Sequence, residues 1–276
     1  MRTVFKLSDI YFYKVFSITL REFKMNYNVT IYIIRLPLNE IPSTIIKILF
    51  SNQLEESITT MKKLFKAIKN DDLVTIQEIL SKRPELISCT AKKPPKADDG
   101  QSLLQVALKN GNIRIANYLL EAGADVNFME SPLCENKWRT PVIHDAINAA
   151  IMTSRWNTNT FGFKVFSTKE KADESYALLK KMLELGADPN AADSFGNSGL
   201  WRFCLQARQI LPGYNHSTHT ILSDRLLTEE LTQDLTRIIR LLKEYGLNME
   251  YVSPNYGKTA LEEYEDEPVC SILSSD

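Results

Sequence analysis

The sequence predicts an all-α solenoid of stacked helix–turn–helix units. Residues 123–127 and 186–190 share the phrase Gly-Ala-Asp-x-Asn, and each run directly follows an apolar, helix-like stretch. A phrase that recurs after the same kind of helix is typical of a repeat architecture. Glycine can end a helix in the left-handed conformation without Cβ strain, and the following Asp and Asn suit a turn because their side chains bond nearby backbone. Such a stack favours binding over catalysis as the function.

Composition and charge favour an ordinary globular protein over a nucleic-acid-binding, disulfide-rich or membrane-spanning one. The 276 residues are 44% hydrophobic and 24% charged, as in an ordinary globular protein, and the net charge of −1 gives no bulk attraction to nucleic acid or to an anionic membrane. The four cysteines are scattered without a C-x-x-C pair, which argues against a disulfide scaffold or a zinc knuckle and fits a reducing compartment. No apolar run approaches the roughly 20 residues of a membrane span, and the N-terminus lacks the pattern of a secretory signal. We therefore expect a cytoplasmic protein.

Residues 1–60 differ from the rest of the chain, so we divide the sequence into an N-terminal extension, 1–60, and a repeat domain, 61–276. The extension contains no Gly and no Ala, and residues 30–34 and 44–50 have the composition of strands. Pro37 and Pro42 break the region. Two hypotheses stay open: a small sheet-forming or poorly ordered extension, or a stretch translated upstream of a start at Met61.

From Met61 onward apolar residues recur at helical spacing. They fall at three- and four-residue intervals on either side of a polar run, Asn70-Asp71-Asp72. That run has N-cap character, so we expect two short helices joined by a tight turn.

The clearest unit covers residues 98–127. It contains Ser102-Leu103-Leu104-Gln105-Val106-Ala107, then Gly111 between two helical stretches, then the Gly-Ala-Asp-x-Asn exit. This segment resembles an ankyrin repeat, whose pattern is a β-turn, a Thr-Pro-Leu-His-x-Ala opening, two antiparallel helices and that exit. Ser102 keeps the hydroxyl cap of the opening, whereas its Pro and His are replaced.

The resemblance divides the domain into about five units, at 61–87, 98–127, 137–190, 193–250 and 254–276. The first unit is degenerate and the last leads into an acidic end, as terminal repeats that meet water often do. In the third unit Ile143-His144-Asp145-Ala146 matches Leu-His-x-Ala, with one extra residue after Thr140-Pro141. The resemblance implies that His144 ties adjacent turns together by hydrogen bonds.

Two units are longer than the pattern, through insertions at 151–173 and 206–230, between the first and second helix. Connections of that kind lie along one edge of an ankyrin stack, so the two insertions should contact each other. The first interleaves aromatic residues, Trp156 among them, with cations. Three roles stay open for these aromatic residues: packing on the second insertion as a satellite core, binding of a protein, or stacking on single-stranded nucleic acid. The second holds His216, His219 and Asp224, which match no strong metal motif.

No catalytic motif is present. The chain has no G-x-S-x-G elbow, no P-loop and no G-x-G-x-x-G phosphate cradle. We expect no catalytic, cofactor-binding or metal site and no enzyme activity.

We therefore predict a monomeric protein-interaction scaffold that binds an unidentified protein partner, and neither nucleic acid nor membrane, through its turn tips and concave first-helix face. Trp138 and Trp201 stand where the ankyrin family rarely places Trp. The candidate contact residues are Gln101, Gln105, Lys109, Trp138, Arg139, Asp145, Trp156, Phe195, Trp201 and Arg202. Two alternatives stay open: a small-ligand-binding protein or enzyme with a pocket between the insertions, and a secreted bacterial effector that acts on host proteins.

Overall fold

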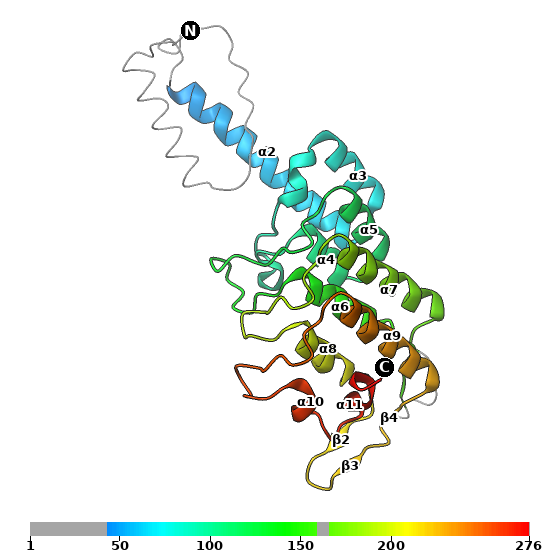
Figure 1. Ribbon diagram of the computed structural model, residues 1–276. Coiled ribbons are helices and arrows are strands. Elements are labelled where there is room, and N and C mark those ends of the chain that lie inside the picture. The colour runs from blue at the N-terminus through cyan, green and yellow to red at the C-terminus, as the bar shows by residue number, and fades with distance from the viewer. Residues whose placement is uncertain (1–42, 159–165, 276) are drawn as a thin grey trace, which may run out of the picture. The chain divides into compact units, whose positions relative to one another are not determined.

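The computed structural model describes residues 43–158 and 166–275, which are mostly helical as predicted (Figure 1). The chain divides into two units, 1–54 and 55–276. The expected strand at 30–34 lies outside the described residues. The α-helices are α2 (Ser43–Lys69), α3 (Leu73–Lys82), α4 (Leu103–Lys109), α5 (Ile113–Glu121), α6 (Val142–Met152), α7 (Lys169–Glu184), α8 (Gly199–Ala207), α9 (Glu229–Glu244), α10 (Ala260–Glu263) and α11 (Pro268–Leu273). Short 3₁₀ turns cover Pro84–Ser88 and Lys96–Asp98.

The helices after α3 form two rows. In the first row α4 contacts α6, α6 contacts α8 and α8 contacts α10, whereas in the second α5 contacts α7, α7 contacts α9 and α9 contacts α11 (Figure 1). Helices α4 and α5, and likewise α6 and α7, also pack on each other. The core lies between the rows and includes Leu104, Ile115, Ile147, Leu179 and Phe203, all essentially inaccessible to solvent.

Short side chains cap the helices where the sequence predicts. The Asp72 carboxylate accepts a hydrogen bond from the Thr75 amide at 3.0 Å and begins α3. At α4 the Ser102 hydroxyl and the Gln105 side chain form a reciprocal capping box. Thr228 caps α9 in the same way through the Leu231 amide.

The prediction of strand structure at residues 44–50 is wrong. These residues belong to α2, which continues to Lys69, so Met61 lies inside the helix instead of beginning it. Strand propensity mainly reflects packing against a neighbouring strand, and it yields to tertiary context. No Gly or Pro interrupts residues 43–69, and a helix that has formed extends at little cost until such a residue stops it.

The exit turns are joined by asparagine side chains. Gly123, Gly186 and Gly246 end α5, α7 and α9 with φ of +89°, +89° and +85°, the left-handed conformation that the repeated phrase predicts. Asn127 donates its Nδ2 hydrogen to the Gly186 carbonyl oxygen at 2.9 Å, and its Oδ1 accepts from the Asp188 amide at 2.9 Å.

Asn190 repeats this pair of contacts one exit later, with the Gly246 carbonyl at 2.8 Å and the Asn248 amide at 2.7 Å. Each exit is thereby fixed to the next, and we call this chain of contacts the asparagine ladder.

The two segments predicted as insertions contact each other, as expected. Helices extend into both predicted ranges, so the connections are shorter: 153–168 between α6 and α7, and 208–228 between α8 and α9. Strand β1 (Asn157–Thr158) of the first connection pairs antiparallel with β4 (Arg225–Leu226) of the second. The second connection also contains a hairpin of β2 (Tyr214–Asn215) and β3 (Thr220–Ile221).

An ion pair fixes the first connection to α9. Arg155 forms a bidentate contact with Asp234, with its Nε 2.9 Å from Oδ2 and its Nη2 2.9 Å from Oδ1. The Arg155 backbone amide also donates to Asp234 Oδ2. Asp234 is buried on α9, and Arg237 of the same helix contacts both Asp234 and Asp173 of α7.

His144 on α6 is a buried structural residue. Its Nε2 lies 2.8 Å from the Ala191 carbonyl oxygen, 47 residues later, so it joins α6 to the turn that follows α7. Burial and the nearby Arg202 charge lower the pKa of His144 to about 4. Within the described part of the chain no helix is both long and apolar enough to cross a membrane.

Replacement of Asn190 with Ala removes both ladder contacts between two exits. We expect a loss of about 1–2 kcal/mol in the free energy of unfolding, measured by urea denaturation, because each net hydrogen bond contributes roughly 1 kcal/mol. Asn248→Ala is the matched control, because the Asn248 side chain accepts from the Glu250 amide in its own turn. Equal losses in the two variants would contradict the ladder.

His144 should make stability depend on pH. Its folded-state pKa lies below its unfolded value near 6.5, so its contribution is complete above about pH 6.5 and is lost as the pH falls toward 4. We expect the difference in unfolding free energy between wild type and His144→Gln to shrink by about 3 kcal/mol between pH 7 and pH 4. Burial raises the pKa of Asp145 to about 7, so Asp145 gives the unfolding free energy a pH dependence of opposite sign. Asp145 is present in both proteins, so the difference between wild type and variant isolates the effect of His144. A difference independent of pH would contradict this role.

Candidate protein-binding surface

The turns that precede α4, α6, α8 and α10 form a continuous row, which we call the tip row (98–101, 134–139, 193–197 and 253–257). Along the row, Asp99 Oδ2 accepts from the Glu135 amide at 2.9 Å, and the Ser194 amide donates to the Arg139 carbonyl at 3.0 Å. Asn255 Nδ2 donates to the Phe195 carbonyl at 2.6 Å. These loops lie along one edge of the stack (Figure 1). Each tip is therefore positioned by its neighbour.

One glycine is required for the close approach of two tips. Gly196 has a φ of +81°, and a Cβ there would lie 2.5 Å from Pro254 Cγ. An L-residue would be strained at this φ and would also collide with the next tip. The tip-to-tip distance thus depends on the absence of a side chain at this position.

Asp193 organises the centre of the row. Its Oδ1 accepts hydrogen bonds from the amides of Phe195 and Asn197 at 2.9 and 3.0 Å. Its Oδ2 accepts from the Trp138 indole Nε1 at 3.0 Å and from Arg202 Nη2 at 3.0 Å. Burial alone would raise the pKa of Asp193, but hydrogen bonds from Asn197, Trp138 and Phe195 outweigh it and hold the pKa below its usual value. The carboxylate is therefore ionised at neutral pH.

Two aromatic rings beside Asp193 face solvent. Trp138 and Phe195 are 47% and 53% exposed, and their rings meet edge to face with centroids 6.0 Å apart. The Arg202 guanidinium lies 5.0 Å from the Trp138 ring centroid, in cation–π geometry, although Arg202 itself is buried. Large apolar side chains with fixed orientation at an exposed position are typical of protein-binding surfaces.

A third exposed aromatic ring lies in the next tip. Tyr256 is 51% exposed and stacks on Trp201 of α8 with centroids 4.9 Å apart and an interplanar angle of 3°. Trp201 is fully buried and also contacts the ring of Tyr264. Trp201 thus supports Tyr256 from beneath and cannot touch a partner.

The structure separates the ten predicted contact residues into groups. Trp138 and Phe195 are exposed and adjacent, Arg139 is half-buried in the same tip, and Lys109 is exposed at the end of α4. Five of the other candidates, in the tip row and on the first-row helices, do not present their side chains to solvent: Gln101, Gln105, Asp145, Trp201 and Arg202 are buried. Gln105, for example, is used in the α4 cap and donates to the Thr140 carbonyl at 2.8 Å.

Trp156 lies apart from the tips, in the first connection. Its ring stacks on Phe166 of the same connection with centroids 4.2 Å apart. Phe161 and Phe163, two further aromatic residues of the predicted insertion at 151–173, lie outside the described residues. Within the described part, the aromatic contact is internal to this connection.

Asp193 and Tyr256 are not among the contact residues predicted from the sequence. A signal for Tyr256 exists, because an aromatic residue directly precedes the tip glycine in two successive units, Phe195-Gly196 and Tyr256-Gly257. Asp193 carries a weaker signal. Its position resembles that of many turn-forming aspartates, and only the folded chain brings Trp138 to it from 55 residues away.

The histidines of the second connection do not form a metal site. His216 Nε2 lies 3.5 Å from Glu267, and His219 accepts or donates a hydrogen bond with the Tyr214 hydroxyl at 3.2 Å. Asp224, which the sequence groups with them, accepts instead from the Gly213 amide at 3.0 Å. In the part of the chain that the structure describes, no group of three or more His, Cys, Asp or Glu residues could hold a metal ion.

Comparison with known proteins adds one finding. Residues 99–130 match the family model of the ankyrin repeat, a module that generally mediates protein–protein interaction and is typically non-catalytic. No curated protein matches the chain. The matched residues begin in the first tip and include α4, α5 and the first exit turn. The chain therefore contains an ankyrin repeat, at the unit where the sequence resemblance is clearest.

Proposed function

We propose that this chain is a non-catalytic scaffold that binds a protein partner through its tip row. The observation that carries the proposal is the pair of exposed rings of Trp138 and Phe195, which meet edge to face above the buried Asp193 carboxylate. This carboxylate accepts from the Trp138 indole and from the Phe195 backbone amide. A rigid aromatic pair loses little conformational entropy when a partner covers it, so its burial adds directly to affinity.

The partner surface that fits this row is an extended segment of a protein with apolar side chains. Tyr256 continues the exposed aromatic surface of the tips, and Leu133 adds an almost fully exposed side chain beside the Trp138 tip. Arg139 and Lys109 supply polar contacts at the margin. Hydrophobic centres with polar rims are typical of such interfaces.

The same proposal extends to the architecture and setting of the chain. The two rows of helices and the asparagine ladder support about five ankyrin-like units, two of them lengthened by the connections at 153–168 and 208–228. We propose a monomeric cytoplasmic scaffold that recognises protein and not nucleic acid, consistent with the net charge of −1.

The double variant Trp138→Ala/Phe195→Ala tests the proposal. A peptide library displayed on phage is selected on the full chain, and the affinities of the selected peptides are measured by calorimetry. We expect the double variant to lose about 30-fold in affinity, since central aromatic hot spots contribute about 2 kcal/mol or more. Tyr245→Ala is the matched control, because Tyr245 is an exposed aromatic residue at the end of α9. Selected peptides that bind wild type and double variant equally would refute the assignment.

Trp201→Ala should behave differently from the surface variants. Trp201 is fully buried beneath Tyr256, so truncation leaves a cavity and we expect a loss of about 3–5 kcal/mol in unfolding free energy. Trp138→Ala should lose much less in the same urea titration. A Trp201→Ala protein as stable as wild type would show that this packing is not the support for Tyr256.

A further inference from the structure

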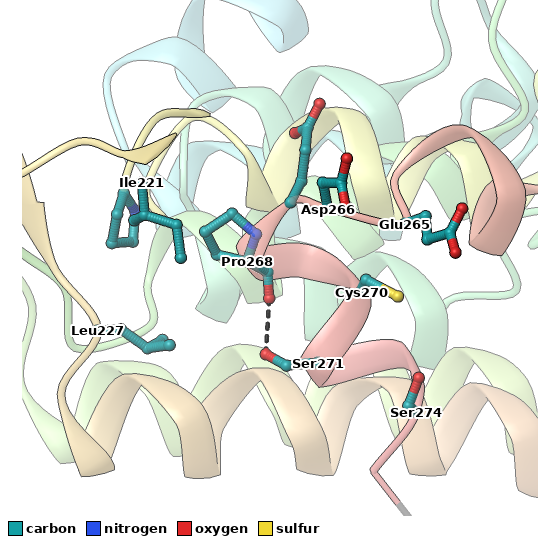
Figure 2. A pocket seen from close by; sticks show the side chains of 10 residues that line it. Ile221, Leu227, Glu265, Asp266, Pro268, Cys270, Ser271 and Ser274 are labelled. Carbon is teal, nitrogen blue, oxygen red and sulfur yellow. Dashed lines mark hydrogen bonds between the residues drawn. The ribbon is translucent and has the colours of Figure 1, made fainter. Parts of the chain in front are cut away.

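A second surface lies between the second connection and the C-terminal segment. It is a groove of about 340 Å³ lined by Pro212, Ile221 and Leu227 on one side. Pro268 and Ser271 of α11, together with Ser274 directly after that helix, line the other side. Figure 2 shows Ile221 and Leu227 facing Pro268 and Ser271 across the opening. The groove shares no residue with the tip row.

The walls of this groove are preformed. The Leu222 amide donates to the Gly213 carbonyl at 2.8 Å, and the Gly213 amide donates to Asp224, so the base of the hairpin is closed. On the other side α11 packs on α9 through its buried residues Val269, Ile272 and Leu273. Arg208 joins the two walls through Glu267, with Nε 2.5 Å from Oε2. A partner would therefore meet a fixed shape.

The apolar side chains of the hairpin face solvent without a structural reason in this fold. Ile221 is 60% exposed, and the neighbouring Leu222 and Leu227 are also exposed. Ile221 and Leu227 line one groove, whereas exposed apolar residues of ordinary surfaces are scattered singly. A volume of about 340 Å³ accommodates one or two large apolar side chains.

The rim of the groove is acidic. Residues 262–267 contain five carboxylates, and cations in ion pairs neutralise some of them: Lys258 lies 3.4 Å from Glu263, and Arg208 pairs with Glu267. The nearby Arg225 is already paired with Asp224 at 2.5 Å. Glu265 and Asp266 line the groove, and in the described chain neither is paired with a Lys or Arg. Asp266 also has His219 Nδ1 at 3.9 Å. The groove thus combines an apolar floor with a negative edge.

We propose that this groove binds a segment of a protein partner in which one large apolar residue is flanked by lysine or arginine. The apolar side chain enters between Ile221 and Pro268, and the flanking cations lie against Glu265 and Asp266. The apolar floor supplies affinity and the carboxylates supply selection by charge, because an acidic segment would meet like charges there. This site is independent of the tip row and would give the scaffold two binding surfaces.

Fluorescence anisotropy with short labelled peptides tests the proposal on the full chain. One peptide set places Leu, Phe or Met between Lys and Arg residues, a second keeps these apolar residues between Glu residues, and a third places Ala between the cations. We expect the first set to bind with a Kd on the order of 10–100 µM and the other two at least about tenfold more weakly. Affinity should fall as salt rises from about 50 mM to about 500 mM.

Two groove variants and two matched controls identify the site. Ile221→Thr should weaken the cationic peptides about tenfold, and Glu265→Gln/Asp266→Asn should weaken them and flatten the salt dependence. Val252→Thr and Glu250→Gln, which change an exposed apolar and an exposed acidic residue elsewhere, should leave affinity unchanged. All are surface changes, and thermal denaturation monitored by circular dichroism shows that each variant is folded.

Several outcomes would overturn the proposal. These are no binding below about 1 mM, equal binding of the Glu-flanked set, or equal binding to Ile221→Thr. Displacement of the peptide by octylamine at equal concentration would indicate a small-molecule amine site instead. Loss of peptide binding in Trp138→Ala/Phe195→Ala would place the peptide on the tip row. The Trp138→Ala/Phe195→Ala variant also separates this proposal from the tip-row proposal, because each binding surface can be shown to be absent without affecting the other.

Discussion

The stack depends on contacts between successive turns, at the exits and at the tips. At the exits, the side chains of Asn127 and Asn190 each form hydrogen bonds with both a carbonyl and an amide of the following exit. Each exit turn therefore fixes the position of the next along the stack. At the tips Asp99, Ser194 and Asn255 make the corresponding contacts. Backbone groups in loops need partners, and here the neighbouring unit provides them. The helices can then bury a common core along the whole array.

The binding surface is a consequence of that arrangement. Asp193 is a turn residue whose carboxylate accepts from its own tip, and it also fixes Trp138 of the preceding tip and Arg202 of the helix behind. The ionised carboxylate is stabilised by these donors despite its burial. The exposed Trp138 ring is consequently fixed through its indole N–H, and Phe195 meets it edge to face. The same contacts that hold the tips together thus determine what a partner meets.

The sequence predicts local features of this fold well and side-chain exposure poorly. The capping residues Ser102 and Asp72, the left-handed exit glycines and the contact between the two long connections all follow from spacing and turn chemistry. Trp201 and Trp138 look alike in the sequence, yet one supports the core and the other faces solvent. That difference depends on Tyr256 and Asp193, which are distant in sequence, so no local pattern contains it. Residues 44–50 show the same limit, because strand-like composition yields to helix continuity.

The pairing of the two connections has a consequence for how the array comes apart. In a linear repeat protein each unit is coupled to its neighbours, and the units with the weakest coupling open first. The strand pair at Asn157 and Leu226, together with the bidentate Arg155–Asp234 contact, adds a coupling between α6 and α9 to the contacts between adjacent helices. The segment from α6 to α9 is therefore expected to behave as one cooperative block, with α3 and its neighbours fraying independently of it.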